Sequence, residues 1–218
     1  MRLIEEVDLP RPLIDAHLDG KLVLFVGAGI SLDYPSSLPT FDGLAEELAE
    51  LAQAPFNVPN RIDEYLGRLE RLIDVKAHTA ARVSRPDSLP NDLHHALARL
   101  ATSGAVPRII TTNFDDHVAE SAKAQGSPIE PLYVGPALPN GRSFRGLVHL
   151  HGRAKTNVRE LVVTDRDFGR AYLTEAWATR FLQDVFVNST VLFVGYSHND
   201  LVMDYLAMGL PSDTSGTH

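Results

Sequence analysis

Apolar and polar positions along the chain follow two patterns, one typical of buried strands and one of helices. Five consecutive apolar residues, Leu22 to Val26, predict a strand that is covered on both faces, as in a parallel sheet. Similar short runs predict further strands at residues 108–111, 132–134, 147–150, 160–163 and 190–194. Because helical patterns separate these strands, we expect an α/β fold with right-handed crossovers, in which helices cover both faces of a mostly parallel, doubly wound sheet.

Apolar residues at helical spacing predict the helices. One is expected to be capped near Asp42 and to carry Leu44, Leu48 and Leu51 on a single face. Others are expected at residues 61–74, 91–101, 166–187 and 199–208. We expect one domain over residues 1–210 and a polar tail at 211–218, where the chain either ends naturally or has been cut from something longer.

The first strand runs directly into Gly27-Ala28-Gly29-Ile30-Ser31. Backbone without Cβ atoms can turn sharply here and approach a ligand closely. In α/β sheets, nucleotide phosphates bind at turns of this kind, which leave the carboxyl end of a strand. The dinucleotide fingerprint has a third glycine where this chain has Leu32, so a tight turn between core elements is the alternative.

Three more of the expected strands end in small or polar residues. These ends are Thr111-Thr112-Asn113-Phe114-Asp115, His149-Leu150-His151-Gly152 and Gly195-Tyr196-Ser197-His198-Asn199-Asp200. Each has a simpler explanation alone, since the first and third are suited to cap a following helix and His151 to occupy a turn. Because the carboxyl ends of parallel strands share one edge of a sheet, we expect all four segments to converge on one crevice.

Composition excludes several classes of site. The chain has 218 residues, a net charge of −8 and no cysteine, which excludes disulfides, thiolate zinc sites and a cysteine nucleophile. No run of Lys or Arg is present, so we expect no direct nucleic-acid binding. The N-terminus has no signal-peptide pattern and no apolar run approaches the ~18 residues of a membrane span, so we expect a cytoplasmic protein without membrane contact.

Taken together, the four strand ends resemble the sirtuin-like NAD-consuming fold in their order and spacing. Residues 163–168, Val-Thr-Asp-Arg-Asp-Phe, resemble a segment of its bacterial branch, and the resemblance extends from about Lys21 to Met208. It implies a Rossmann-like domain that binds NAD⁺ as a substrate. The residues it implies for cofactor binding are Gly27, Ala28, Gly29 and Ser31 at the pyrophosphate, Asp115 at the nicotinamide ribose pocket, and Gly195 and Ser197 at the adenosine half.

The same resemblance implies that Asn113 and His151 are catalytic, and the chemistry of these residues agrees with those roles. Breaking the nicotinamide–ribose bond develops oxocarbenium character on the sugar, and an uncharged amide can orient both the ribose and a water. A histidine that titrates near neutrality can take a proton from a hydroxyl or from water. A metal site of His149 with His151 is a rival interpretation, but no carboxylate at ligand spacing is evident, so we expect no metal. His94 and His95 are expected to face solvent from a helix.

The chain departs from sirtuin deacylases in two places. The four-cysteine zinc module that follows Leu-His-Gly in deacylases is absent, because only residues 153–159 separate Gly152 from the next expected strand. Asp42 stands where the deacylase loop has an arginine. Protein deacylation therefore becomes unfavoured, and water becomes the expected acceptor of the ribosyl group.

A zinc-free chain of this kind resembles the sirtuin-like domains of bacterial antiphage systems, which destroy cellular NAD when a sensor triggers them. The resemblance implies an NAD⁺ hydrolase that works as a homo-oligomer, with a sensor or activating module fused C-terminally or supplied by another protein. One alternative is an NAD-dependent protein deacylase or ADP-ribosyltransferase that uses the same site. Another is a non-catalytic module that binds NAD or an ADP-ribose derivative.

Overall fold

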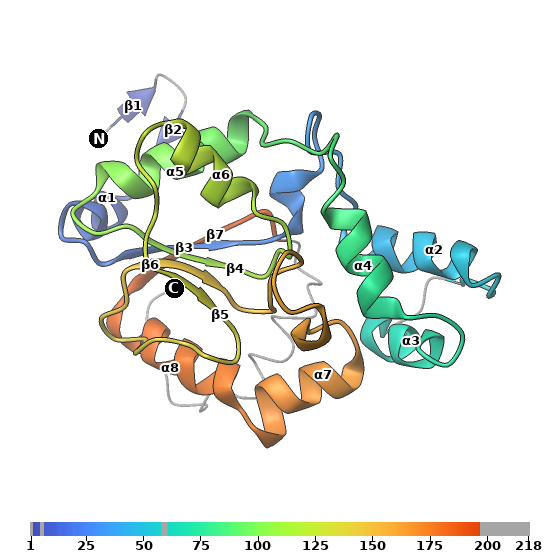
Figure 1. Cartoon of the computed structure of the whole chain (residues 1–218). Coiled ribbons are helices and arrows are strands. Elements are labelled where there is room, and N and C mark those ends of the chain that lie inside the picture. Colours follow the sequence, from blue (N-terminus) through green and yellow to red (C-terminus); the bar gives the residue numbers. More distant parts are fainter. Residues whose placement is uncertain (1, 5–6, 58–60, 197–218) are drawn as a thin grey trace.

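The structure of the chain is a computed structural model that describes residues 2–4, 7–57 and 61–196 (Figure 1). The expected helix at 199–208, Ser197 and the polar tail at 211–218 lie outside the described residues. Among the described helices, none is long and apolar enough to span a membrane.

Five strands form one sheet in which every neighbouring pair is parallel. Their order is β5 (Leu132–Val134), β6 (Gly146–His149), β4 (Arg108–Thr111), β3 (Leu22–Val26) and β7 (Thr190–Val194). The strands end level with one another, since Val26 pairs with Thr111 and Val194, and Thr111 pairs with His149. The expected α/β, Rossmann-like fold is confirmed.

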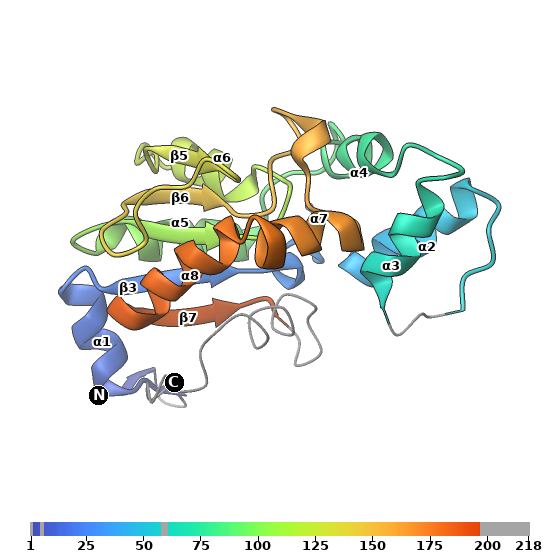
Figure 2. The same cartoon turned by 90° about the horizontal axis from the view of Figure 1, so that it is seen from below.

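Helices cover both faces of this sheet (Figures 1 and 2). On one face lie α1 (Arg11–Leu18), α5 (Asp92–Ser103) and α6 (His117–Ala124), packed on Leu22, Leu24 and Val26 of the central strand. On the other face lies α8 (Trp177–Asn188), packed on Val23 and Phe25. Because successive residues of β3 enter opposite cores, the strand is apolar at all five positions rather than at alternate ones.

A third helical group lies past the carboxyl ends of the strands (Figure 2). It consists of α2 (Phe41–Leu51), α3 (Ile62–Leu69) and α4 (Val75–Val83), which share a core of their own. Phe114 and Val163, which belong to the segments that follow β4 and β6, are buried in that core. The helical group thus packs against the segments that leave the carboxyl edge of the sheet.

Three details of the expected helices are wrong. The cap of α2 is Thr40, whose hydroxyl accepts a hydrogen bond from the Gly43 amide at 3.2 Å, and Asp42 lies inside the first turn. Leu51 is 53% exposed because it is the last residue of that helix, beyond the packed face. The helix expected at 61–74 ends at Leu69. A separate helix, α4, begins at Val75, and the Asp74 side chain caps it by accepting a hydrogen bond from the Ala77 amide.

The strand expected at 160–163 is also wrong. A 3₁₀ turn, η2 (Val158–Glu160), is followed by Leu161, Val162 and Val163, which are buried without pairing to the sheet. A short apolar run reports burial, and burial alone does not distinguish a strand from an irregular core segment.

The helix expected at 166–187 is broken into three parts. These are α7 (Asp165–Gly169), a π-helical turn η3 (Arg170–Thr174) and α8. Ala176, which caps α8, has a left-handed backbone with φ of 51°, which interrupts the helical path. The sequence also did not predict α1, α6 or the antiparallel pair β1 (Arg2–Ile4) and β2 (Val7–Asp8).

Candidate active site at the carboxyl edge of the sheet

The glycine-rich loop after β3 packs against the loop after β7. The Gly27 amide donates to the Val194 carbonyl at 2.9 Å, and the Gly29 amide donates to the Gly195 carbonyl at 2.9 Å. A Cβ atom on Gly29 would lie 2.8 Å from the Gly195 oxygen, and Gly195 itself has φ of +76°. These glycines are therefore required for the close approach of two backbones. Ala28 begins the 3₁₀ turn η1 (Ala28–Ser31). Contact of these residues with a cofactor stays a prediction.

Asn113 lies at the centre of a buried polar network next to this loop. Its side-chain amide donates to the Gly27 carbonyl at 3.2 Å and to Ser31 Oγ at 3.4 Å. Ser31 Oγ in turn donates to Asp115 Oδ2 at 3.2 Å. Within the described part of the chain, Oδ1 of Asn113 has no hydrogen-bond partner. The expected residues Gly27, Ser31, Asn113 and Asp115 are thus brought together, with one carbonyl oxygen left to bind a ligand or water.

His94 belongs to the same network, and the expectation that it faces solvent is wrong. Its side chain is 0% exposed, with Nε2 3.1 Å from Ser31 Oγ and Nδ1 2.7 Å from Asn91 Oδ1. Burial, with smaller effects from His117 and His95, lowers the pKa of His94 to about 3, so the ring is neutral. Asn91 caps α5 and also donates to the Ile30 carbonyl at 2.8 Å, which fixes the helix against the glycine-rich loop. The Asn91–His94 spacing, three residues apart at a helix start, was the available signal.

His151 lies in a different environment from Asn113. It is 3% exposed, and its Nε2 atom is 2.7 Å from the hydroxyl of Tyr172 in η3. The ring contacts Phe168 and Tyr172 edge-on, at centroid distances of 5.1 and 5.8 Å. Burial lowers the pKa of His151 to about 3, so the imidazole is in the neutral form that a proton acceptor requires.

His149 does not share a partner with His151. Its Nδ1 atom lies 3.4 Å from the Asn113 carbonyl, and its Nε2 atom lies 4.0 Å from Asp116 Oδ1. Burial lowers the pKa of His149 more than the charge of Asp116 raises it. In the described ranges, no group of three or more histidine and carboxylate side chains is arranged to hold a metal ion.

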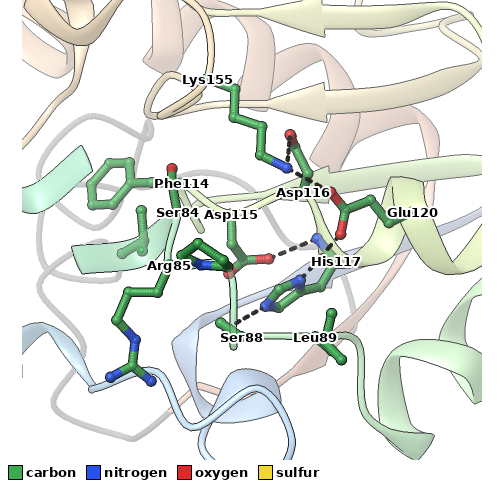
Figure 3. Close-up of a pocket in the computed structure, with 12 residues that line it drawn as sticks. Ser84, Arg85, Ser88, Leu89, Phe114, Asp115, Asp116, His117, Glu120 and Lys155 are labelled. Carbon is green, nitrogen blue, oxygen red and sulfur yellow. Dashed lines mark hydrogen bonds and ion pairs between the residues drawn. The ribbon is translucent and has the colours of Figure 1, made fainter. Parts of the chain in front are cut away.

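A polar pocket of about 170 Å³ lies on the other side of Asp115 (Figure 3). Its walls are the loop from Val83 to Leu89 and the first turn of α6, with Lys155 at one side. Ser88 Oγ lies 2.8 Å from Nε2 of His117, and the His117 amide donates to Asp115 Oδ1 at 3.0 Å (Figure 3). Asp115 is therefore held on both oxygens by the protein, which fixes its position beside Ser31.

Comparison with known proteins places this site in a family. A family model described as "SIR2-like domain" matches residues 107–218. The chain belongs to the SIR2-like domain family. The matched range begins just before β4 and includes Asn113, Asp115 and His151, whereas Gly27 to Ser31 lie outside it.

Two relatives of the SIR2-like chain extend the comparison. It is similar to uncharacterized protein y4cA of Sinorhizobium fredii (strain NBRC 101917 / NGR234), at 32% identity over 231 residues that cover 94% of this chain and 19% of that protein. It is also similar to defense-associated sirtuin 2 of Bacillus subtilis, at 25% identity over 209 residues that cover 92% of this chain and 20% of that protein. The chain thus spans about a fifth of the length of both relatives.

The two buried neutral histidines predict that this domain loses stability in mild acid. A histidine whose pKa is lower in the folded state contributes stability that is present above its unfolded pKa of about 6.5 and is lost as the pH falls below it. We expect the free energy of unfolding to fall by roughly 1 kcal/mol per pH unit for each of His94 and His151. Urea unfolding at pH 7.5, 6.5 and 5.5 measures this slope.

The substitution His94→Gln is expected to make that slope shallower, because one titrating group is removed. His78→Gln, at a partly exposed position in α4, is the matched control and is expected to leave the slope unchanged. Equal unfolding free energies of the unsubstituted protein at pH 7.5 and 5.5 would contradict the buried neutral state of both rings.

Proposed function

We propose that this chain hydrolyses NAD⁺ to nicotinamide and ADP-ribose. The observation that carries the proposal is Asn113, whose amide nitrogen is held by Gly27 and Ser31 while its oxygen has no protein partner among the described residues. An amide fixed in this way can orient a ribose hydroxyl or a water without paying the entropy of ordering itself during the reaction. Membership of the SIR2-like family, whose domains use NAD⁺, supports the choice of substrate.

The residues at the carboxyl edge fit NAD⁺ in their chemistry. An oriented amide, a carboxyl group and a neutral imidazole follow neighbouring parallel strands, which is where α/β folds bind nucleotides. Gly27, Ala28, Gly29 and Ser31 would hold the pyrophosphate, Asp115 the nicotinamide ribose pocket, and Gly195 and Ser197 the adenosine half. The substrate supplies a good leaving group, since nicotinamide departs as a neutral molecule.

Each catalytic residue has a distinct task in the proposed reaction. Asn113 positions the acceptor water against the ribose through its free Oδ1. His151 accepts a proton from a ribose hydroxyl or from that water. The burial of Asn113, Asp115 and His151 excludes bulk solvent, which strengthens every polar contact in the site.

The biological role we propose is that of an effector domain in a bacterial antiphage system, which depletes cellular NAD in the cytoplasm. The printed name of defense-associated sirtuin 2 supports this role. The chain spans about a fifth of each relative, whose remaining length has room for further modules. We propose that a sensor or activating module is fused C-terminally to the domain at residues 1–210 or supplied by another protein. We expect low activity until homo-oligomerisation or that module orders the site.

A second candidate, a non-catalytic module that binds NAD or an ADP-ribose derivative, is favoured by one observation. The pKa of about 3 makes His151 a weak proton acceptor in the free protein. An active hydrolase therefore requires that binding or assembly raises the basicity of this ring.

A nicotinamide-release assay distinguishes the candidates. The protein is incubated with NAD⁺ in the presence and absence of an acetyl-lysine peptide. We expect peptide-independent release, and His151→Ala is expected to lower it by about 10²- to 10⁴-fold. Release that requires the peptide would favour a deacylase or ADP-ribosyltransferase, and binding of NAD⁺ without release in the assembled protein would favour the binding module.

A further inference from the structure

The segment that contacts His151 is an unusual turn in a long helical stretch. Tyr172 belongs to η3, a π-helical turn of the kind that is often found at functional sites. The turn is closed by the Glu175 and Ala176 amides, which both donate to the Arg170 carbonyl, at 3.0 and 3.1 Å. Thr179 Oγ1 also donates to the Tyr172 carbonyl at 2.7 Å, which fixes the backbone of Tyr172 from the first turn of α8.

The side chain of Tyr172 is as firmly held as its backbone. Its ring stacks on Phe168 with a centroid distance of 6.0 Å and an interplanar angle of 17°, and Tyr172 is buried. His151 meets both rings edge-on, at 80° to each. The imidazole thus contacts two aromatic rings, and the Tyr172 hydroxyl lies 2.7 Å from its Nε2 atom.

The hydrogen between Nε2 and the hydroxyl can belong to either residue, and the two cases differ chemically. If Tyr172 donates, the neutral ring carries its proton on Nδ1, and its single lone pair is already bonded. If Nε2 donates, the lone pair is on Nδ1, for which the described residues provide no hydrogen-bond partner. Only the second arrangement leaves His151 a nitrogen that is free to accept a proton.

We propose that Tyr172 is a positioning residue of the NAD⁺ hydrolase, which accepts a hydrogen bond from Nε2 of His151 and so keeps Nδ1 as the proton acceptor. This inference rests on the function proposed above, because it assigns His151 the role of the base. It follows the general arrangement in which a base is held in one tautomer and one orientation by a second group behind it.

The substitution Tyr172→Phe tests the proposal, because it removes one oxygen atom and keeps the ring that stacks on Phe168. We expect kcat for nicotinamide release to fall at least about tenfold, with KM for NAD⁺ changed by less than about twofold. Tyr65→Phe is the matched control, since it removes a hydroxyl bonded to the Pro55 carbonyl at 2.9 Å in the helical group, and it is expected to leave both constants unchanged. An unchanged kcat in Tyr172→Phe would overturn the proposal.

Nitrogen NMR of histidine-labelled protein gives a readout that does not depend on activity. The His151 ring signals, assigned by their loss in His151→Ala, are expected to show a protonated Nε2 and an unprotonated Nδ1. In Tyr172→Phe they are expected to shift towards a mixture of tautomers, and in Tyr65→Phe to stay as they were. A ring protonated on Nδ1, or signals that Tyr172→Phe leaves unmoved, would contradict the role of Tyr172. Absence of nicotinamide release from the unsubstituted protein would instead contradict the proposed hydrolase, while the NMR result still decides how the two side chains are coupled.

Discussion

Replacing Asn113 with alanine is expected to lower NAD⁺ hydrolysis by at least about a hundredfold. The substitution removes a side-chain oxygen of the buried network that has no hydrogen-bond partner among the described residues, and with it the group that we propose orders water against the ribose. Binding of NAD⁺ is expected to weaken much less than kcat falls, because the pyrophosphate and adenosine contacts that we propose lie elsewhere on the edge. Steady-state nicotinamide release and calorimetric binding of NAD⁺ separate the two effects.

The stability of Asn113→Ala is expected to change little by comparison. The variant loses two hydrogen bonds, at 3.2 and 3.4 Å, and leaves the Gly27 carbonyl without this donor, at a cost of about 1 to 2 kcal/mol. Asn140→Ala is the matched control, since Asn140 is an exposed turn residue whose Oδ1 accepts from the Arg142 amide at 2.9 Å. Full activity of Asn113→Ala would remove the main support for the hydrolase.

A second substitution at this position tests the need for an uncharged amide. Asn113→Asp keeps an oxygen but replaces the donor to Gly27 and Ser31 with a second carboxylate beside Asp115. The new carboxylate oxygen would then face the Gly27 carbonyl, which is also an acceptor, so this contact becomes repulsive. We expect this variant to be as inactive as Asn113→Ala, and activity near the level of the unsubstituted protein would show that the oxygen alone is sufficient.

The sheet could be predicted from the sequence because each strand is visible as a run of apolar residues within its own few positions. A strand of a parallel sheet that is covered on both faces is a short apolar run, as β3 is, and the expected bounds of β3, β4, β5 and β7 are confirmed. Parallel pairing then places the carboxyl ends of these strands along one edge of the sheet. This was enough to place Asn113, Ser31 and Asp115 together, as the structure shows.

The surroundings of the candidate site could not be predicted, because they depend on contacts between distant residues. His94 reaches Ser31 across 63 residues of sequence, and its spacing from Asn91 indicates a helix cap but not the contact with Ser31. The contact between His151 and Tyr172 depends on a π-helical turn, which a pattern with a period of 3.6 residues does not reveal. Leu161 to Val163 read as a strand, since a pattern reports burial and not hydrogen-bond partners.

Replacing Arg153 with methionine is expected to lower the free energy of unfolding by about 3 kcal/mol, the largest stability change we expect at this edge. The side chain of Asp116 is only 4% exposed, and Arg153 contacts both of its oxygens, at 2.5 and 3.0 Å. Burial alone would raise the pKa of Asp116, but the hydrogen bonds and charge of Arg153, with smaller effects of His149 and Lys155, hold it below its usual value. Removing the arginine leaves a buried carboxylate with Lys155 at 3.4 Å and His149 at 4.0 Å.

The sign of the pH dependence distinguishes this effect from simple loss of packing. In the unsubstituted protein the lowered pKa of Asp116 contributes stability that is present above about pH 4 and is lost as the pH falls through the folded-state value. In Arg153→Met the pKa of Asp116 is expected to rise, so its carboxyl becomes neutral at a higher pH. As the pH falls from 7 to 5, the variant is therefore expected to recover part of the unfolding free energy that the substitution removed. Urea unfolding of both proteins at these two values measures the recovery.

Arg142→Met is the matched control, because Arg142 pairs with Asp184 on the surface at 3.2 Å. An exposed pair of this kind contributes within about 1 kcal/mol, so the control is expected to lose little stability at either pH. Asp116 precedes α6 directly after Asp115, so a displaced Asp116 would also disturb the bonds that hold Asp115 beside Ser31. We therefore expect Arg153→Met to lower nicotinamide release as well as stability. If Arg153→Met were as stable as Arg142→Met, the buried ion pair would not be what stabilises this edge of the sheet.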